Sequence, residues 1–142
     1  MSQSPQSDQS AARPASYPGW DGTLPRRRAT VIVRRADRLL VVRDRGRPTY
    51  ALPGGGIEEG ELPIVAAARE LYEETGLEAY AIRFLFVFEG KYNDHHLYEV
   101  EAEGEVVVRG EVDGFAWWDM EDDTPVYPHV RGILERFNGL NG

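Results

Sequence analysis

Three glutamates on one expected helix, over residues 62–75, are the side chains best suited to chemistry. At about 100° per residue, Glu70, Glu73 and Glu74 fall within an arc of about 100°. Like charges at these spacings repel and the last turn of a helix disfavours anions, so helix stability does not account for them. Mg²⁺ and Mn²⁺ prefer clustered oxygen ligands. The cluster predicts a divalent-cation site, and the alternative is a solvated acidic face with an Arg69–Glu73 ion pair.

The same helix is expected to pack on a sheet through the face opposite the glutamates. Pro63 stands where a first-turn proline is tolerated, and Gly76 stands where helices commonly end. The apolar residues assigned to the buried face are Ile64, Val65, Ala68, Leu71 and Tyr72. The helix is thus expected to bury one face and to present its carboxylates on the other.

The residues around this helix follow a defined spacing from residue 55 to residue 77. Nine specified positions match the order Gly, five residues, Glu, seven residues, Arg-Glu-apolar, one residue, Glu-Glu, one residue, Gly-apolar. This pattern resembles the Nudix box of the Nudix hydrolases, a family that includes the MutT-like nucleotide pyrophosphohydrolases. A chance match is on the order of one in 10⁵ to 10⁶. The resemblance extends over residues 29–137, with Tyr50 where many relatives carry Trp.

The resemblance implies an α+β fold, an α/β/α sandwich around a mixed β-sheet, with the box helix on one side and the C-terminal helix on the other. It also implies a Mg²⁺ cofactor, for which Mn²⁺ can substitute, that neutralises a diphosphate and lowers the pKa of an attacking water. Without such an ion, a chain of net charge −8 would repel a polyphosphate. Arg69 would orient a neighbouring carboxylate, and Glu61 would be structural or an outer ligand. The implied metal ligands are Gly55, Glu70, Glu73, Glu74 and Glu111, and the implied catalytic residues are Arg69, Glu70, Glu73, Glu74 and Glu111.

One acid in this set lies outside the box. Relatives often supply such a residue as a ligand or a general base, and Glu111, six residues before Trp117, best fits their acid-before-aromatic pattern. The alternative is one more surface glutamate in an acidic stretch. Asp94 and Glu99 are the substitutes for this role.

A further group of side chains is expected to bind the substrate. Arginines can meet phosphates and aromatic rings can stack on a base. The predicted substrate-binding residues are Arg43, Arg45, Tyr50, Tyr92 and His95. The alternative is that the arginines solvate strand ends, the aromatic rings pack in the core and the histidine is partly exposed. His95 and His96 face opposite sides of a strand and cannot share one metal site.

The composition limits the class of protein. The chain has 142 residues, 42% of them apolar, and no cysteine, which favours one compact domain over a disulfide scaffold or a Cys-ligated zinc module. Its longest apolar runs are far below the roughly 20 residues of a membrane span, and no secretory signal is recognisable. We expect a cytoplasmic protein without a membrane partner.

Charge is divided unevenly along the chain. Residues 1–50 carry 10 Arg and 4 Asp, a net charge of +6, whereas residues 51–142 have a net charge of −14. A basic field that would coat a nucleic acid is therefore absent, although the arginines between residues 26 and 47 could meet phosphates locally. Solvation of strand ends and turns is the alternative role for these arginines.

Turn signals and apolar runs predict the elements that position these residues. The polar segment 1–23 is expected to be a mobile tail, followed by a single domain over 24–142. A closing helix is expected over 124–137. Strands are expected over 29–33, 39–42, 50–52, 81–88, 97–100, 106–109 and 114–118.

The function implied by the resemblance is hydrolysis of a pyrophosphate bond in a nucleoside diphosphate linked to some group X. A nucleoside or deoxynucleoside triphosphate, or a modified nucleotide, fits the short chain best. The small-molecule nucleotide would be the main partner, with no nucleic acid expected in that role, and the protein would be a monomer or homodimer. Two alternatives stay open: a nucleotide-binding regulatory module without turnover, and an RNA-end pyrophosphohydrolase that uses the arginines as a phosphate track.

Overall fold

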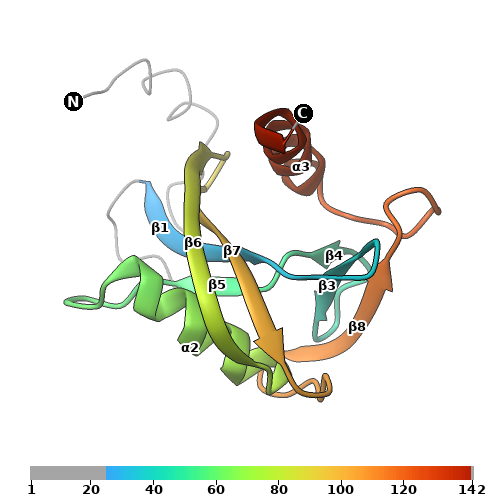
Figure 1. The fold of residues 1–142 in the computed structure, drawn as a ribbon, viewed down its shortest axis with the longest axis horizontal. Coiled ribbons are helices and arrows are strands. Elements are labelled where there is room, and N and C mark those ends of the chain that lie inside the picture. The colour runs from blue at the N-terminus through green and yellow to red at the C-terminus, as the bar shows by residue number, and fades with distance from the viewer. Residues whose placement is uncertain (1–24, 142) are drawn as a thin grey trace.

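A computed structural model of the chain describes residues 25–141 as strands packed between two helices (Figure 1). The expected tail over residues 1–23 and the domain boundary at residue 24 lie outside the described residues. The elements in chain order are β1 (Arg26–Ile32), β2 (Arg34–Arg35), β3 (Arg38–Asp44), β4 (Tyr50–Ala51), β5 (Gly54–Gly56), α2 (Pro63–Thr75), β6 (Glu78–Glu89), β7 (Asn93–Glu103), β8 (Val112–Trp118) and α3 (Pro128–Asn141).

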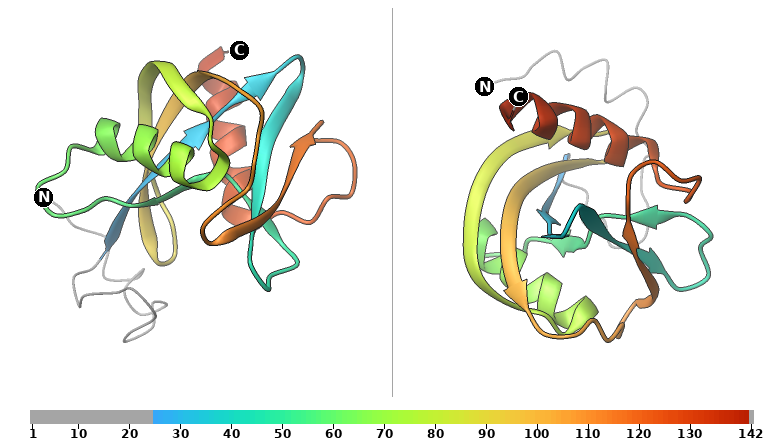
Figure 2. Two further views of the ribbon diagram at one scale, coloured as in Figure 1. Left: turned by 90° about the horizontal axis from the view of Figure 1, so that it is seen from below. Right: turned by 45° about the vertical axis from the view of Figure 1, so that its right-hand side comes forward.

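The strands form two sheets. The first has the order β5-β1-β7-β6 and is mixed, because β1 runs parallel to β7 while the other neighbours are antiparallel. Its strands β6 and β7 form a long curved ribbon (Figure 2). The second sheet is antiparallel, and its strand β3 pairs with each of β2, β4 and β8. The parallel pairing aligns Arg28 with His95, which are far apart in the sequence.

Successive residues at the end of β1 point into two separate hydrophobic cores. Val31 and Val33 pack with Ala66, Ala67 and Leu71 of α2 in one core. The core on the other side contains the apolar residues of α3 and its neighbours, among them Ile32, Leu39, Val130, Ile133 and Phe137. The two helices therefore cover opposite sides of the strands, as Figure 1 shows. The expected α+β fold with a mixed sheet between two helices is confirmed.

The expected buried face of α2 is wrong in part. Ile64, Val65 and Tyr72 are exposed, with 41%, 51% and 44% of their surfaces accessible, whereas two adjacent alanines, Leu71 and Thr75 are buried. Small side chains allow the helix to approach the sheet and β5 closely, and the buried arc then includes the glutamate side of the helix. The carboxylates are consequently turned toward the glycine strand rather than away from the protein.

Two expected elements also differ. Residues 106–109 form no strand; the Val107 and Arg109 amides donate instead to carbonyls at the end of α2, those of Thr75 at 2.9 Å and Glu74 at 3.1 Å. The closing helix begins at Pro128 rather than at residue 124 and continues past residue 137. The last carbonyls of a helix have no donor within the helix and need one from elsewhere. Residues 106–109 supply donors to the end of α2 instead of pairing with a strand. None of the helices within residues 25–141 is long and apolar enough to cross a membrane.

Candidate active site

The glycine strand β5 lets two groups approach its backbone. A Cβ on Gly54, whose φ is +152°, would lie 2.2 Å from the carbonyl oxygen of Ala29 on β1. A Cβ on Gly55 would lie 2.3 Å from the carboxylate carbon of Glu70. Only glycine fits at these two positions, because any side chain would displace the strand or the carboxylate. β5 thus forms a cradle that holds the Glu70 carboxylate against the backbone.

Arg69 ties the box helix to the loop before it. Its guanidinium donates to Glu61 at 2.6 and 2.9 Å and to the Gly56 carbonyl at 3.1 Å. It also donates to Glu70 at 2.9 Å and to Glu73 at 3.1 Å. The hydrogen bonds from Arg69 lower the pKa of Glu61 to about 2, so this carboxylate is ionised at neutral pH. One arginine therefore holds three carboxylates and the loop in a fixed arrangement.

Glu74 is the most deeply placed carboxylate of the cluster. The Gly54 amide donates to its Oε1 at 3.2 Å. Burial raises the pKa of Glu74 to about 8, and burial also raises the pKa of Glu70. Glu70 is paired with Arg69, whereas Glu74 has no ion pair among the described residues, and a bound cation would supply positive charge there. The oxygen donors and the open backbone at Gly55 therefore fit a hard divalent cation.

These side chains are not yet arranged around an ion. Within residues 25–141, no group of three or more His, Asp or Glu side chains stands ready to hold a metal. Arg69 contacts both Glu70 and Glu73, and the Glu73 side chain is 56% exposed. Arg69 donates to one oxygen of each carboxylate, Oε2 of Glu70 and Oε1 of Glu73, so the second oxygen of each is left for an ion.

Two acids expected from outside the box, Glu111 and its substitute Glu99, make contacts with residues other than the three box glutamates. The Glu111 side chain is exposed, and its backbone carbonyl accepts from the Arg45 amide at 2.8 Å. The loop that carries Glu111 nevertheless borders the end of α2, because a Cβ on neighbouring Gly110 would lie 3.7 Å from the Glu73 carbonyl oxygen. The substitute acid Glu99 is paired with Arg34 at 2.7 Å and with Arg83.

Three of the five expected substrate-binding residues do not line the pocket described next. Arg43 pairs with Asp113 at 3.4 Å and lies over the ring of Tyr50, 5.6 Å from its centre. The Arg45 guanidinium donates to the Gly110 carbonyl at 3.2 Å. Arg43 and Tyr50 thus contact each other on the second sheet, and Arg45 contacts the loop before β8.

An aromatic pocket of about 400 Å³ opens beside Glu74. The expected residues Tyr92 and His95 line it. Glu74 and Arg28, one of the arginines expected to meet phosphates locally, also line it, whereas sequence reasoning missed Asp44, Asn93, Tyr127 and His129. No local pattern marks them, because they belong to the ends of different elements.

Ring stacking organises one wall of the aromatic pocket. The rings of His95 and His129 are stacked with centres 4.8 Å apart, and Tyr127 stacks on His129 at 5.8 Å. His95 is buried, 4% exposed, and its Nδ1 lies 2.9 Å from the Thr30 hydroxyl. Burial lowers the pKa of His95 to about 2 and that of His129 to about 4. Both imidazoles are therefore neutral at pH 7, and the expectation of a partly exposed His95 is wrong.

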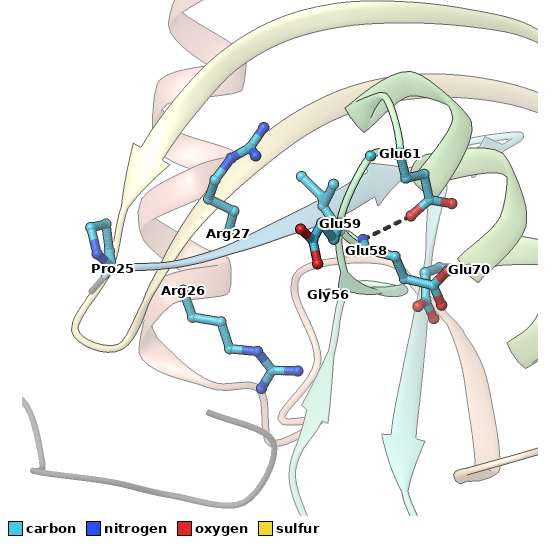
Figure 3. A pocket seen from close by; sticks show the side chains of 10 residues that line it. Pro25, Arg26, Arg27, Gly56, Glu58, Glu59, Glu61 and Glu70 are labelled. Carbon is cyan, nitrogen blue, oxygen red and sulfur yellow. Dashed lines mark hydrogen bonds between the residues drawn. The ribbon is translucent and has the colours of Figure 1, made fainter. Parts of the chain in front are cut away.

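A second, polar cavity of about 730 Å³ is lined by the loop before α2 and by residues of β1 (Figure 3). Glu70 and Gly56 border it, and Arg26 and Arg27 reach it from β1. We name it the polar groove. The carboxylate cluster thus contributes to both cavities, with Glu74 lining the aromatic pocket and Glu70 lining the polar groove.

Comparison with known proteins identifies the family. The NUDIX domain model matches residues 24–137. The crystal structure of a nudix hydrolase family member from Chromobacterium violaceum is similar, with a TM-score of 0.74 and 33% identity over 82% of this chain and 79% of that chain. The chain belongs to the Nudix hydrolase family, as its box indicates.

Two curated relatives match over shorter segments. Diphosphoinositol polyphosphate phosphohydrolase 2 from Rattus norvegicus is 43% identical over 60 residues, which are 42% of this chain and 34% of that protein. An RNA pyrophosphohydrolase from Cereibacter sphaeroides is 53% identical over 38 residues, 27% of this chain and 24% of that protein. The chain thus spans about a third or less of these relatives, and both names describe phosphohydrolase chemistry.

Proposed function

We propose that the protein hydrolyses a pyrophosphate bond in a nucleoside diphosphate linked to X, with Mg²⁺ or Mn²⁺ as cofactor. A nucleoside triphosphate, deoxynucleoside triphosphate or modified nucleotide is the proposed substrate class. The observation that carries the proposal is the carboxylate cluster: the Gly54 amide holds Glu74, which lines the aromatic pocket, and Glu70 lines the polar groove. A diphosphate that spans both cavities would cross the carboxylate cluster.

The residues proposed to hold Mg²⁺ are Glu70, Glu73, Glu74 and the Gly55 carbonyl, with Glu111 as a further ligand or base. When bound, the ion offsets phosphate charge and acidifies a water. Arg69 keeps the carboxylates in register with the loop, and the Gly54 amide fixes one oxygen of Glu74. The glycine cradle leaves room for the Glu70 carboxylate beside the backbone.

The proposed substrate contacts fall into two groups. Tyr92 and His95 belong to the aromatic pocket, where an uncharged imidazole and a phenol suit a planar base. Arg43 and Arg45 stay predicted phosphate contacts at the second sheet, and Tyr50 stays a predicted stacking residue. A cytoplasmic location and a monomeric or homodimeric state also stay predictions.

Hydrolysis of an RNA 5′ end is a second candidate. Arg26 and Arg27 line the polar groove next to Glu70, where a chain of phosphates could continue beyond the scissile bond. Cleavage of triphosphorylated or capped RNA that weakens steeply with salt, without the same effect on free nucleotides, would favour this candidate over a free nucleotide.

The test is release of phosphate and pyrophosphate from a substrate panel with Mg²⁺, Mn²⁺ or EDTA. The panel contains nucleoside triphosphates, 8-oxo-dGTP, ADP-ribose, NADH, nucleotide sugars, diadenosine polyphosphates and capped RNA. Glu73→Gln and Glu74→Gln should each lower kcat by about 10²-fold or more, because an amide is a poorer ligand for a hard cation. Exposed Glu103 provides the matched control, Glu103→Gln, with an unchanged rate. Tight nucleotide binding without turnover would support the regulatory module instead.

A further inference from the structure

The guanidinium of Arg28 has a buried Nε for which the described residues 25–141 offer no hydrogen-bond partner. Arg28 lies on β1 between β5 and β7, paired with Gly56 on one side and His95 on the other. Within residues 25–141 its guanidinium makes none of the hydrogen bonds or ion pairs that Arg69 makes, and its Nε is buried without a partner. Burial lowers the pKa of Arg28, because desolvation disfavours the charged form of the guanidinium.

A buried N–H of a charged group that has no hydrogen-bond partner is costly, so its retention needs a reason. The negative side chains that interact with Arg28 over distance are Glu74, Asp44 and Glu70. None of them forms an ion pair with it among the described residues. Long-range balance of these acids is one possible role. It leaves the fork of N–H donors unused, however, and arginine is the side chain suited to bidentate contacts.

The surroundings of Arg28 favour an anion that comes from outside. Arg28 lines the aromatic pocket together with Glu74, His95 and His129. Both imidazoles are neutral, so the cations that line the pocket are Arg28 and Lys91. Of these two, Arg28 is the one with a buried, unpartnered nitrogen among the described residues. The pocket itself is about 400 Å³, large enough for a ring with an attached phosphate. A phosphate beside Glu74 would lie within reach of the carboxylate cluster.

We propose that Arg28 binds the α-phosphate of a nucleotide whose base is seated in the aromatic pocket. This is the phosphate that stays attached to the sugar after hydrolysis. This deepens the proposed function, on which it rests, because it makes Arg28 a substrate-binding residue and sets the direction of the substrate. The ring would lie among Tyr92, Tyr127 and His129, and the diphosphate would run past Glu74 toward the polar groove. The pocket would then bind nucleoside monophosphates in preference to the uncharged nucleosides.

Binding without metal separates this proposal from turnover. Isothermal titration of the full chain in EDTA at pH 7 would compare the four common 5′-nucleoside monophosphates with their parent nucleosides. The wild type should bind at least one monophosphate about 10- to 100-fold more tightly than its nucleoside, since hydrogen bonds between charged groups have that magnitude. Arg28→Gln should abolish this ratio. Arg28→Lys should keep part of it, because the ammonium retains charge but lacks the fork.

Arg83→Gln is the matched control, since the Arg83 side chain is 63% exposed on β6 and pairs with Glu99. It should leave the ratio unchanged. Thermal unfolding of each variant would show whether it folds, and if Arg28→Gln does not, Arg28→Lys decides. A ratio near one in the wild type, or an undiminished ratio in a folded Arg28 variant, would overturn the proposal.

Turnover then distinguishes the two hypotheses. If the wild type hydrolyses a panel substrate and the Arg28 variants keep its KM and kcat/KM, the role of Arg28 is refuted while the hydrolase stands. If no substrate is hydrolysed but Arg28→Gln abolishes the monophosphate preference, the binding role stands and the proposed hydrolysis fails. A rise in KM larger than the fall in kcat is the expected result for a residue that holds the ground state.

Discussion

Replacement of Glu74 by glutamine should change how the stability of the metal-free protein depends on pH. Burial raises the pKa of Glu74 from its ordinary value of 4.5 to about 8 in the folded state. Between these pH values the folded protein binds more protons at this site than the unfolded chain does. The free energy of unfolding therefore falls as pH rises, by up to about 1.4 kcal/mol per pH unit.

The magnitude follows from this slope. Over about pH 5 to 7.5 the full slope amounts to about 3 kcal/mol, and partial exposure of Glu74 reduces it through solvent screening to about 1–3 kcal/mol. For a domain of this size that corresponds to a melting-temperature loss of about 3–10 °C. Glu74→Gln cannot ionise, so this loss should disappear from its pH profile.

Thermal unfolding in EDTA, followed by circular dichroism across this pH range, would measure the effect. The histidines contribute with the opposite sign: the pKa of His129 is lowered to about 4 from 6.5, so stability rises as pH rises through that interval. This contribution is common to wild type and variant, and the difference between their curves isolates Glu74. Glu103→Gln should reproduce the wild-type curve.

Parallel curves for wild type and Glu74→Gln would refute the reasoning, because the buried carboxyl would then not titrate differently in the two states. Mg²⁺ adds a second check. The ion should stabilise the wild type most at high pH, where Glu74 would otherwise carry an uncompensated charge, and should stabilise Glu74→Gln less. Equal stabilisation of both proteins would remove Glu74 from the proposed ligand set.

Three further substitutions test the cluster. Gly55→Ala places a Cβ 2.3 Å from the Glu70 carboxylate carbon, so it should lower kcat about 10-fold or more and also lower stability. The control Gly139→Ala meets nothing within 4 Å and should keep the rate. Initial rates and melting temperatures of both variants measure these effects. Arg69→Lys keeps the charge but loses the fork, so the Mg²⁺ concentration for half-maximal rate should shift; an unchanged value would contradict an orienting role. Glu111→Gln should lower kcat while fold and metal binding persist, and an unchanged rate would move that role to another acid.

The local part of the site could be predicted from the sequence because its residues lie on one helix and the loop before it. The spacing from residue 55 to residue 77 located the helix, its proline start and its glycine end, and it indicated the family. The direction of the helix was not predictable from apolarity alone. Two alanines, rather than Ile64 and Val65, face the sheet, because close approach to a glycine strand matters more here than the size of the buried side chains.

The aromatic pocket could not be predicted because pairing between distant segments creates it. The parallel register of β1 with β7 sets Arg28 beside His95, and the start of α3 brings His129 onto that imidazole. The arginine run on β1 is divided by the same geometry: Arg26 and Arg27 reach the polar groove, while Arg28 lies in the aromatic pocket. Solvation of a strand end was a sound expectation for each arginine taken alone. A single run of like residues lines both cavities because β1 contributes Arg26 and Arg27 to one and Arg28 to the other, next to the glycine strand with which it pairs.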